Sequence, residues 1–200
     1  MDKRIIRDSL RLIGAICFVW MYAPHLVAYL ISGGKTFIDS DLKRMRHQIH
    51  VKLPLWLQLI YLLHNNSYYR RLFYYRVGPI WALLTGWYRP GCGSFSISYT
   101  TRIGKGVWFA HPYSTIINVE AVGDNFSCIH CTTLGDKGGR RHVIGNNVSV
   151  SCNVCVIGGV HIGNNVTIGA GSVVVKDIPD NCVVAGNPAK VIRKLKPIIA

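Results

Sequence analysis

Residues 144–174 read IGNNVSVSCNVCVIGGVHIGNNVTIGAGSVV, and this stretch decides the fold. Aliphatic residues recur in it at every sixth position, and a second aliphatic series with the same interval lies between them. The first series consists of Ile144, Val150, Val156, Ile162, Ile168 and Val174, and the second of Val148, Val154, Val160 and Val166. A period of six is neither helical nor a plain alternating strand, so it predicts a short strand followed by a corner.

The residues between the aliphatic positions support this prediction. Gly145, Gly163 and Gly169 directly follow members of the first series, and asparagines fill much of the remaining space. Gly and Asn best tolerate the left-handed backbone that tight corners require. Beyond an interruption at 135–143, which we interpret as a loop extruded from the coil, the spacing recovers Val122, Cys128 and Leu134. Stacked hexapeptides form a parallel β-helix, in which each coil buries its inward residues against its neighbours.

Seven cysteines are an odd number, which argues against a complete set of disulfides and favours reduced thiols. Two pairs have the C-x-x-C spacing that is typical of a zinc ribbon, namely Cys128/Cys131 and Cys152/Cys155. In the six-residue register, however, Cys128 takes an inward position and the other three fall where small residues suit tight coils. We therefore interpret these thiols as packing residues and expect no metal site, since free cysteine behaves as a small hydrophobe.

The chain of 200 residues has a net charge of +14 and divides into halves of different composition. Residues 1–90 are apolar and aromatic and carry 13 basic and 4 acidic side chains, whereas residues 91–200 are rich in Gly, Val, Ile and Asn. The stretch Pro90–Gly93 has the composition of a loop. We therefore expect a helical N-terminal region at 1–92, a β-helix at 93–186 with a loop at 135–143, and a C-terminal tail or helix at 187–200.

The run Leu12–Gly34 contains no charged residue and is long enough to cross a bilayer. Basic residues on both sides of the run and Pro24 within it argue against a single span. Two interpretations stay open for residues 1–90: a broken or in-plane helix pair that contacts the inner face of the membrane, or a soluble helical subdomain. The basic aromatic stretch Tyr68–Arg76 comes with no nucleic-acid motif, so we expect no nucleic-acid partner.

Four groups of segments, read together, resemble the serine acetyltransferase-like branch of the hexapeptide acyltransferases, close to polysaccharide O-acetyltransferases. They are 109–113 (FAHPY) with 116–118, 132–135 (TTLG), 138–142 (GGRRH), and 168–174 with 178–179 and 185–192. The resemblance implies a mainly β fold, a left-handed parallel β-helix that follows an α-helical N-terminal region. It also implies a cytoplasmic O-acetyltransferase that forms a homotrimer and binds acetyl-CoA between adjacent subunits.

The resemblance assigns roles to individual residues as well. His111 is the candidate general base, and imidazole has an ordinary pKa suited to taking a proton from a hydroxyl near neutral pH. His142 and Arg141 match positions that hold the acceptor. The positions that match the cofactor-binding end are Gly169, Ala170, Lys190 and Arg193. Basic side chains there would meet the phosphates of CoA.

Two departures from the serine acetyltransferase pattern bear on the acceptor. Where those enzymes carry aspartates, this chain has Ser96–Tyr99 and Ala110. A serine ammonium group would lack a counter-charge without them, which favours a sugar of a surface polysaccharide or its precursor. Serine O-acetylation in cysteine biosynthesis and a non-catalytic hexapeptide scaffold stay as alternatives. The partner that orients His111 is left open between a backbone carbonyl, Asp124 and Glu120.

The other histidines of the second half carry weaker predictions. We interpret His130 and His161 as surface or corner residues of the β-helix. A carbonic-anhydrase-like zinc site made of His111, His130 and His142 is not favoured, because their flanking residues do not resemble that class.

Overall fold

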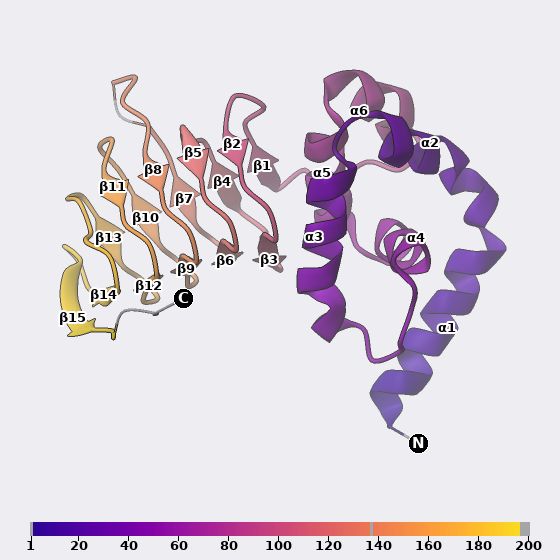
Figure 1. The fold of residues 1–200 in the computed structure, drawn as a ribbon, viewed down its shortest axis with the longest axis horizontal. Coiled ribbons are helices and arrows are strands. Elements are labelled where there is room, and N and C mark those ends of the chain that lie inside the picture. Colours follow the sequence, from indigo (N-terminus) through magenta and orange to yellow (C-terminus); the bar gives the residue numbers. More distant parts are fainter. Residues whose placement is uncertain (1, 137, 197–200) are drawn as a thin grey trace. The chain divides into compact units, whose positions relative to one another are not determined.

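A computed structural model describes residues 2–136 and 138–196 of the chain. It divides after Gly93 into two compact units, the first helical and the second built from β-strands (Figure 1). Residues 197–200, the end of the segment expected as a tail or helix, lie outside the described residues.

The helical unit, residues 2–93, consists of six α-helices and two short 3-10 turns among its described residues. They are α1 (Lys3–Cys17), η1 (Val19–Tyr22), α2 (Ala23–Ile31), α3 (Lys35–Met45), η2 (Arg46–Gln48), α4 (Leu55–Asn65), α5 (Ser67–Val77) and α6 (Pro79–Gly86). The side chain of Asn66 caps α5 by accepting from the N–H groups of Tyr68 and Tyr69, both at 3.0 Å. Pro79 opens α6, the position where a missing N–H costs nothing.

The core of the helical unit lies around α4. Leu59, Leu63 and Phe73 are fully buried there. Two buried carboxylates accompany this apolar core. Asp41 pairs with Arg76 (Nε to Oδ2, 2.9 Å), and Asp8 of α1 bonds residues of the loop before α4 and of α4 itself.

No single helix among the described residues is long and apolar enough to cross a membrane. Two helical stretches, Lys3–Cys17 and Val19–Ile31, pass the length and composition test only when taken together, and they meet at a bend of 73°.

The β unit is a parallel solenoid with three faces, and its strands are two to five residues long. One face is β1 (Phe95–Ile97), β4 (Thr115–Ile117), β7 (Thr133–Leu134), β10 (Cys155–Val156) and β13 (Val173–Val174). The second is β2 (Arg102–Ile103), β5 (Ala121–Val122), β8 (Val143–Ile144) and β11 (His161–Ile162). The third is β3 (Trp108–Ala110), β6 (Ser127–Ile129), β9 (Ser149–Val150), β12 (Val166–Ile168), β14 (Cys182–Ala185) and β15 (Lys190–Lys194).

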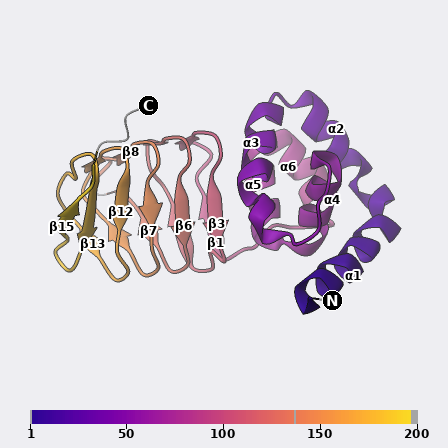
Figure 2. The same cartoon turned by 60° about the horizontal axis from the view of Figure 1, so that its bottom comes forward.

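We call these faces sheets A, B and C in that order. Each of the first four coils contributes one strand to each sheet, and the last coil contributes β13 to sheet A and β14 to sheet C. The coils stack side by side (Figures 1 and 2). This is the parallel β-helix expected from the six-residue spacing, with the left-handed coil that the family resemblance implies. The six-residue series points inward as predicted, because Ile144, Val156, Ile162 and Ile168 are at most 2% exposed.

One corner of the solenoid, between sheets B and C, is built from two ladders of side-chain amides and carboxylates. The N–H of Asp124 donates to Asn146 Oδ1, and the N–H of Asn146 to Asn164 Oδ1, both at 2.8 Å. One position further along, side-chain amides bond coil to coil at 2.9 to 3.1 Å. These amides belong to Asn125, Asn147, Asn165 and Asn181, all with φ of 56° or 57°. Asn therefore supplies both the left-handed corner and the bond to the next coil.

The C-terminal end of the β unit differs from the expected tail or helix. Residues Lys190–Lys194 form β15, which runs antiparallel to β14 and ends sheet C. This strand covers the otherwise open edge of β14 with exposed basic side chains, and charged residues on an edge strand discourage further strand addition.

Substituting Gly145 should destabilise the β unit, because this glycine stacks directly on the next coil. A Cβ atom there would lie 2.9 Å from the backbone C and O of Gly163. We expect Gly145→Ala to lower the free energy of unfolding by about 3 kcal/mol, measured by urea denaturation. Gly93→Ala is the matched control, since its Cβ would meet nothing within 4 Å. Equal stability of the two variants would contradict the stacking argument.

Candidate active site

His111 lies in a turn that is two residues longer than its equivalent in the next coil. Trp108 pairs with Ser127, and Ile116 pairs with Thr133. Between these two paired positions the chain advances eight residues at His111 but only six in the next coil. The regular strand register on both sides leaves no room for the extra residues, so the turn is pushed outward. His111 is exposed there, with a left-handed φ of 48°.

The same edge of the solenoid carries part of the predicted cofactor-binding set. The strand register of sheet C shows which corner residues are equivalent in successive coils. At the corner between sheets C and A, the equivalent residues are His111, His130, Cys152 and Ala170. Neighbouring strands are about 4.8 Å apart, so Ala170 lies about 14 Å along the axis from the coil of His111.

The turn at Gly169 and Ala170 is tightly built. Ser172 Oγ donates to the carbonyl of Gly169 at 2.6 Å and accepts from the N–H of Gly186 at 3.3 Å. A Cβ atom on Gly169 would lie 3.0 Å from that of Ala185, so the glycine keeps the adjacent coils close. Ala170 itself is exposed and accessible to a ligand.

The two basic candidates for cofactor binding lie on β15. Lys190 pairs with Ala185, at the end of β14 that meets the same corner, and Arg193 pairs with Val183 further along the strand. Both side chains are exposed. The structure thus brings Gly169, Ala170 and Lys190 to one end of sheet C and places Arg193 along its edge.

Arg141 lies at a different corner, between sheets A and B. Its Nη2 atom donates to Thr101 Oγ1 at 3.2 Å and to Asn118 Oδ1 at 3.1 Å. Its Nε atom is buried and has no hydrogen-bond partner among the described residues. His111 and Arg141 are therefore at opposite edges of sheet A within one chain.

His142 is completely buried, and both of its ring nitrogens contact the backbone. Nδ1 accepts from the N–H of Val160 at 3.1 Å, which makes Nε2 the protonated nitrogen, and Nε2 donates to the carbonyl of Gly135. The ring thus links Gly135 to Val160 of the next coil. An acceptor could reach the His142 ring only if this loop opened.

Sequence reasoning missed an aromatic pair beside His111. The ring of Tyr113 stacks on His130, with centroids 4.8 Å apart and planes 8° from parallel. Tyr113 is 42% exposed, and its N–H donates to the carbonyl of His111 at 2.7 Å. The extra residues before β4 were the signal available in the sequence. They extend this turn toward the next coil, where Tyr113 meets His130.

The carboxylates considered as partners of His111 are engaged elsewhere. Asp124 accepts from the N–H of Lys105 at 2.7 Å at the corner between sheets B and C, and Glu120 pairs with Arg102 at 3.0 Å. Within residues 2–136 and 138–196, no hydrogen bond to the His111 ring is present.

The cysteines take structural positions. Cys128 is 1% exposed, and burial raises the pKa of its thiol to about 12, so it stays protonated at neutral pH. All seven thiols are free. In the part of the chain that the structure describes, no three His, Cys, Asp or Glu side chains are grouped so as to hold a metal ion.

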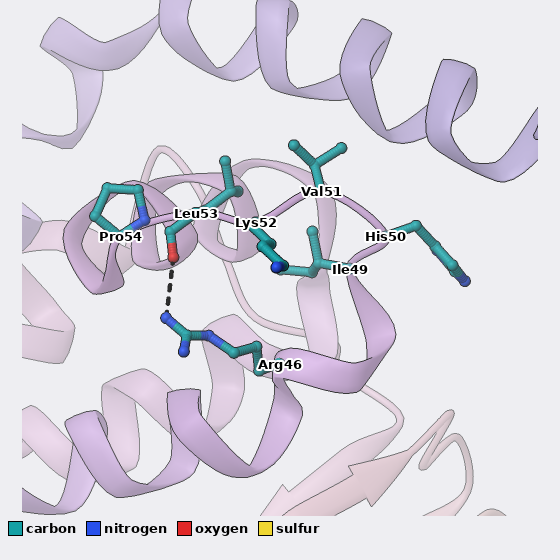
Figure 3. Close-up of a pocket in the computed structure, with 7 residues that line it drawn as sticks. All are labelled: Arg46, Ile49, His50, Val51, Lys52, Leu53 and Pro54. Carbon is teal, nitrogen blue, oxygen red and sulfur yellow. Dashed lines mark hydrogen bonds between the residues drawn. The ribbon is translucent and has the colours of Figure 1, made fainter. Parts of the chain in front are cut away.

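A pocket in the helical unit contains none of the predicted site residues. It is lined by Arg46 and residues 49–54, and Arg46 donates from Nη2 to the carbonyl of Leu53 at 3.2 Å (Figure 3). Four of the predicted residues of the β unit are instead exposed on the edges of the solenoid, namely His111, Ala170, Lys190 and Arg193.

Residues 141–176 match the family model of the bacterial transferase hexapeptide (six repeats). The matched segment contains β8 to β13 of the β unit. The chain is 43% identical over 96 residues to a serine acetyltransferase of Synechococcus elongatus. It is 40% identical over 101 residues to the putative colanic acid biosynthesis acetyltransferase WcaB of Escherichia coli K12. These matches span 46% and 48% of this chain but only 39% and 62% of the two relatives.

Solved structures share the fold over more of the chain. The serine acetyltransferase of Vibrio cholerae has a TM-score of 0.67 at 22% identity, with 85% of this chain and 70% of that one covered. The serine acetyltransferase of Neisseria gonorrhoeae in complex with serine has a TM-score of 0.66 at 25% identity, with 86% and 74% covered. A hexapeptide-repeat domain that follows a helical region is therefore a shared architecture.

The two histidines should differ in their effect on stability. His142→Ala leaves the N–H of Val160 and the carbonyl of Gly135 unpaired in the interior, so we expect unfolding free energy to fall by at least about 2 kcal/mol. His111→Ala removes an exposed ring and should change it by less than about 0.5 kcal/mol. Urea denaturation of both variants tests this. A His142→Ala protein as stable as the wild type would show that the ring does not hold the loop.

Proposed function

We propose that this chain is an acetyl-CoA-dependent O-acetyltransferase that uses His111 as its general base and acetylates a sugar hydroxyl of a surface polysaccharide or its precursor. The observation that carries the proposal is the two-residue extension of the turn at His111. It presents an imidazole on the solenoid edge that also holds Ala170 and Lys190. The similarity to two named acetyltransferases supports the same reaction class.

His111 suits the proton transfer that the reaction needs. Its neutral imidazole takes the proton of the acceptor hydroxyl as the oxygen attacks the thioester carbonyl carbon. When the tetrahedral adduct collapses, the carbon–sulfur bond breaks and the imidazolium returns the proton to the leaving thiolate. The products are the acetyl ester and free CoA thiol, and His111 ends in its starting state.

The donor would lie along the edge between sheets C and A. Ala170 is exposed about 14 Å from the coil of His111, a span that the extended pantetheine arm can bridge. Lys190 and Arg193 supply positive charge for the phosphates of CoA. Gly169 lets two adjacent coils approach closely at this edge, because it has no side chain.

The surroundings of Arg141 favour a neutral acceptor. Its guanidinium bonds Thr101 and Asn118, and Ser98 and Thr100 form a hydroxyl pair at 2.8 Å beside them. These neighbours offer hydroxyl and amide groups but no carboxylate for an ammonium ion, and hydroxyls and amides are the partners that a sugar requires. His142 would join this acceptor site when the loop 135–142 opens. Serine O-acetylation is the second candidate, favoured by the likeness to serine acetyltransferases.

The assembly in this proposal is a homotrimer. His111 and Arg141 occupy opposite edges of sheet A, so packing adjacent copies edge to edge would bring the base of one to the acceptor site of the next. Acetyl-CoA as donor also places the domain in the cytoplasm, with the helical unit free to contact the inner face of the membrane.

Replacing His111 should abolish acetyl transfer. We expect His111→Ala to lower kcat by about a hundredfold to ten-thousandfold, measured as thiol release from acetyl-CoA, with CoA affinity and sedimentation unchanged. His161→Ala is the matched control, since His161 is an exposed histidine of the same solenoid on sheet B. An active His111→Ala enzyme would refute the mechanism.

The acceptor is tested by the same assay with serine and a panel of neutral sugars and oligosaccharides. We expect acceptor-dependent thiol release with a sugar and little with serine, because the side chains that bond Arg141 carry hydroxyl and amide groups rather than a carboxylate. Efficient turnover of serine would replace the sugar proposal with the second candidate. CoA binding without thiol release on any acceptor would favour a non-catalytic scaffold.

A further inference from the structure

The first helix of the chain turns its aliphatic residues away from the protein. Asp8 and Ala15 are its buried residues. The exposed aliphatic side chains are Ile5 (37%), Ile6 (39%), Leu10 (65%), Ile13 (58%) and Ile16 (47%). Ile6, Leu10 and Ile13 are spaced by four and three residues and therefore share one face. A surface helix ordinarily packs its apolar face on the core, so α1 is inverted.

Hydrogen bonds to Asp8 hold α1 in this inverted orientation. The Asp8 carboxylate accepts from the N–H of His50 (3.1 Å) and from the hydroxyl of Tyr61 (3.1 Å), and it contacts the His50 ring at 2.9 Å. Burial by itself would raise the pKa of Asp8, but these bonds and Arg7 outweigh it and hold the pKa at about 2. Rotating α1 to bury its aliphatic face would break this cluster.

The exposed apolar surface continues beyond α1. The residues of η1, α2 and the link before them add Phe18 (48%), Trp20 (70%), Val27 (46%), Leu30 (62%) and Ile31 (65%). Helices α1 and α2 run along one outer rim of the helical unit, and α4 lies on their inner side (Figures 1 and 2). We call the exposed apolar residues of α1, η1, α2 and Phe18 the apolar rim. An exposed apolar surface of this kind marks a binding surface for a protein or a membrane.

Basic residues flank the apolar rim. Helix α1 carries exposed Lys3, Arg4, Arg7 and Arg11 on a sector next to the aliphatic one. The acidic residues of the helical unit are all paired, Asp2 with Arg4, Asp8 with Arg7, Asp39 with Lys35 and Asp41 with Arg76. The surface beside the rim is therefore positive. Helices that lie in a membrane interface combine such an apolar face with Lys and Arg.

We propose that the apolar rim lies flat in the interfacial layer of a bilayer that contains anionic lipids, with the basic sector of α1 on lipid phosphates. The 73° bend between α1 and η1–α2 suits two segments that lie in one plane. Trp20, at the bend, is an amphipathic ring of the kind that settles at the level of the headgroups. Charge favours lipid over a second copy of this chain, since two copies joined by their rims would bring two basic sectors together.

Vesicle flotation of the full-length protein without detergent tests the proposal. We expect the protein to float with phosphatidylcholine vesicles that contain phosphatidylglycerol and to float far less with phosphatidylcholine alone. Leu10→Gln/Ile13→Gln should lower the partition coefficient about tenfold per residue, because each removes buried apolar surface. Lys3→Gln/Arg4→Gln should lower it roughly fivefold per residue on anionic vesicles. All four positions are exposed on α1, so the variants should keep the wild-type circular dichroism and thermal midpoint.

Ile192→Gln is the matched control, since Ile192 is a 64% exposed aliphatic residue of β15, and its flotation should equal that of the wild type. Absence of wild-type flotation with anionic vesicles would overturn the proposal. Sedimentation velocity tests the other possible occupant of the apolar rim, a second copy of this chain. If Leu10→Gln/Ile13→Gln reduces the assembly size while vesicles bind neither protein, the rim is an interface between copies and the proposal is wrong. Flotation requires no catalysis, so this result is independent of the proposed transfer reaction.

Discussion

The repeated bond across the corner between sheets B and C is the constraint on which the β unit depends. At each coil the backbone N–H of one residue donates to the side-chain oxygen of its counterpart in the next coil, as in the step from Asp124 to Asn146. The glycine before it, such as Gly145, allows the coils to touch at backbone distance. Together these contacts fix the coil-to-coil register, and the aliphatic series then has a single inward direction.

A fixed register explains where the chemistry is placed. Because the strands keep step, inserted residues can only leave the solenoid at a corner. The short extension at His111 leaves between sheets C and A, and the longer loop 135–142 leaves between sheets A and B with Arg141 at its end. The scaffold is thus uniform, and the candidate site consists of its irregularities, which lie on two edges of sheet A.

Much of the fold followed from the sequence, because inward Val and Ile positions and corner Asn residues are local signals that repeat. The features that the sequence did not indicate have physical reasons. The Lys190–Lys194 segment forms a strand because it pairs with the open edge of β14. The residues of the segment have no pattern that predicts this pairing. The burial of His142 depends on backbone atoms of Gly135 and Val160, which carry no side-chain signature. The inward placement of Asp8 depends on His50 and Tyr61, which are distant in sequence.

The most direct measurement of the central claim is an experimental structure of the full chain bound to CoA. We expect the CoA thiol to lie beside the His111 turn, the pantetheine arm to follow the edge past Ala170, and Arg141 of an adjacent copy to face the same space. CoA bound with its thiol remote from His111, or with His111 and Arg141 of every copy pair far apart, would contradict it.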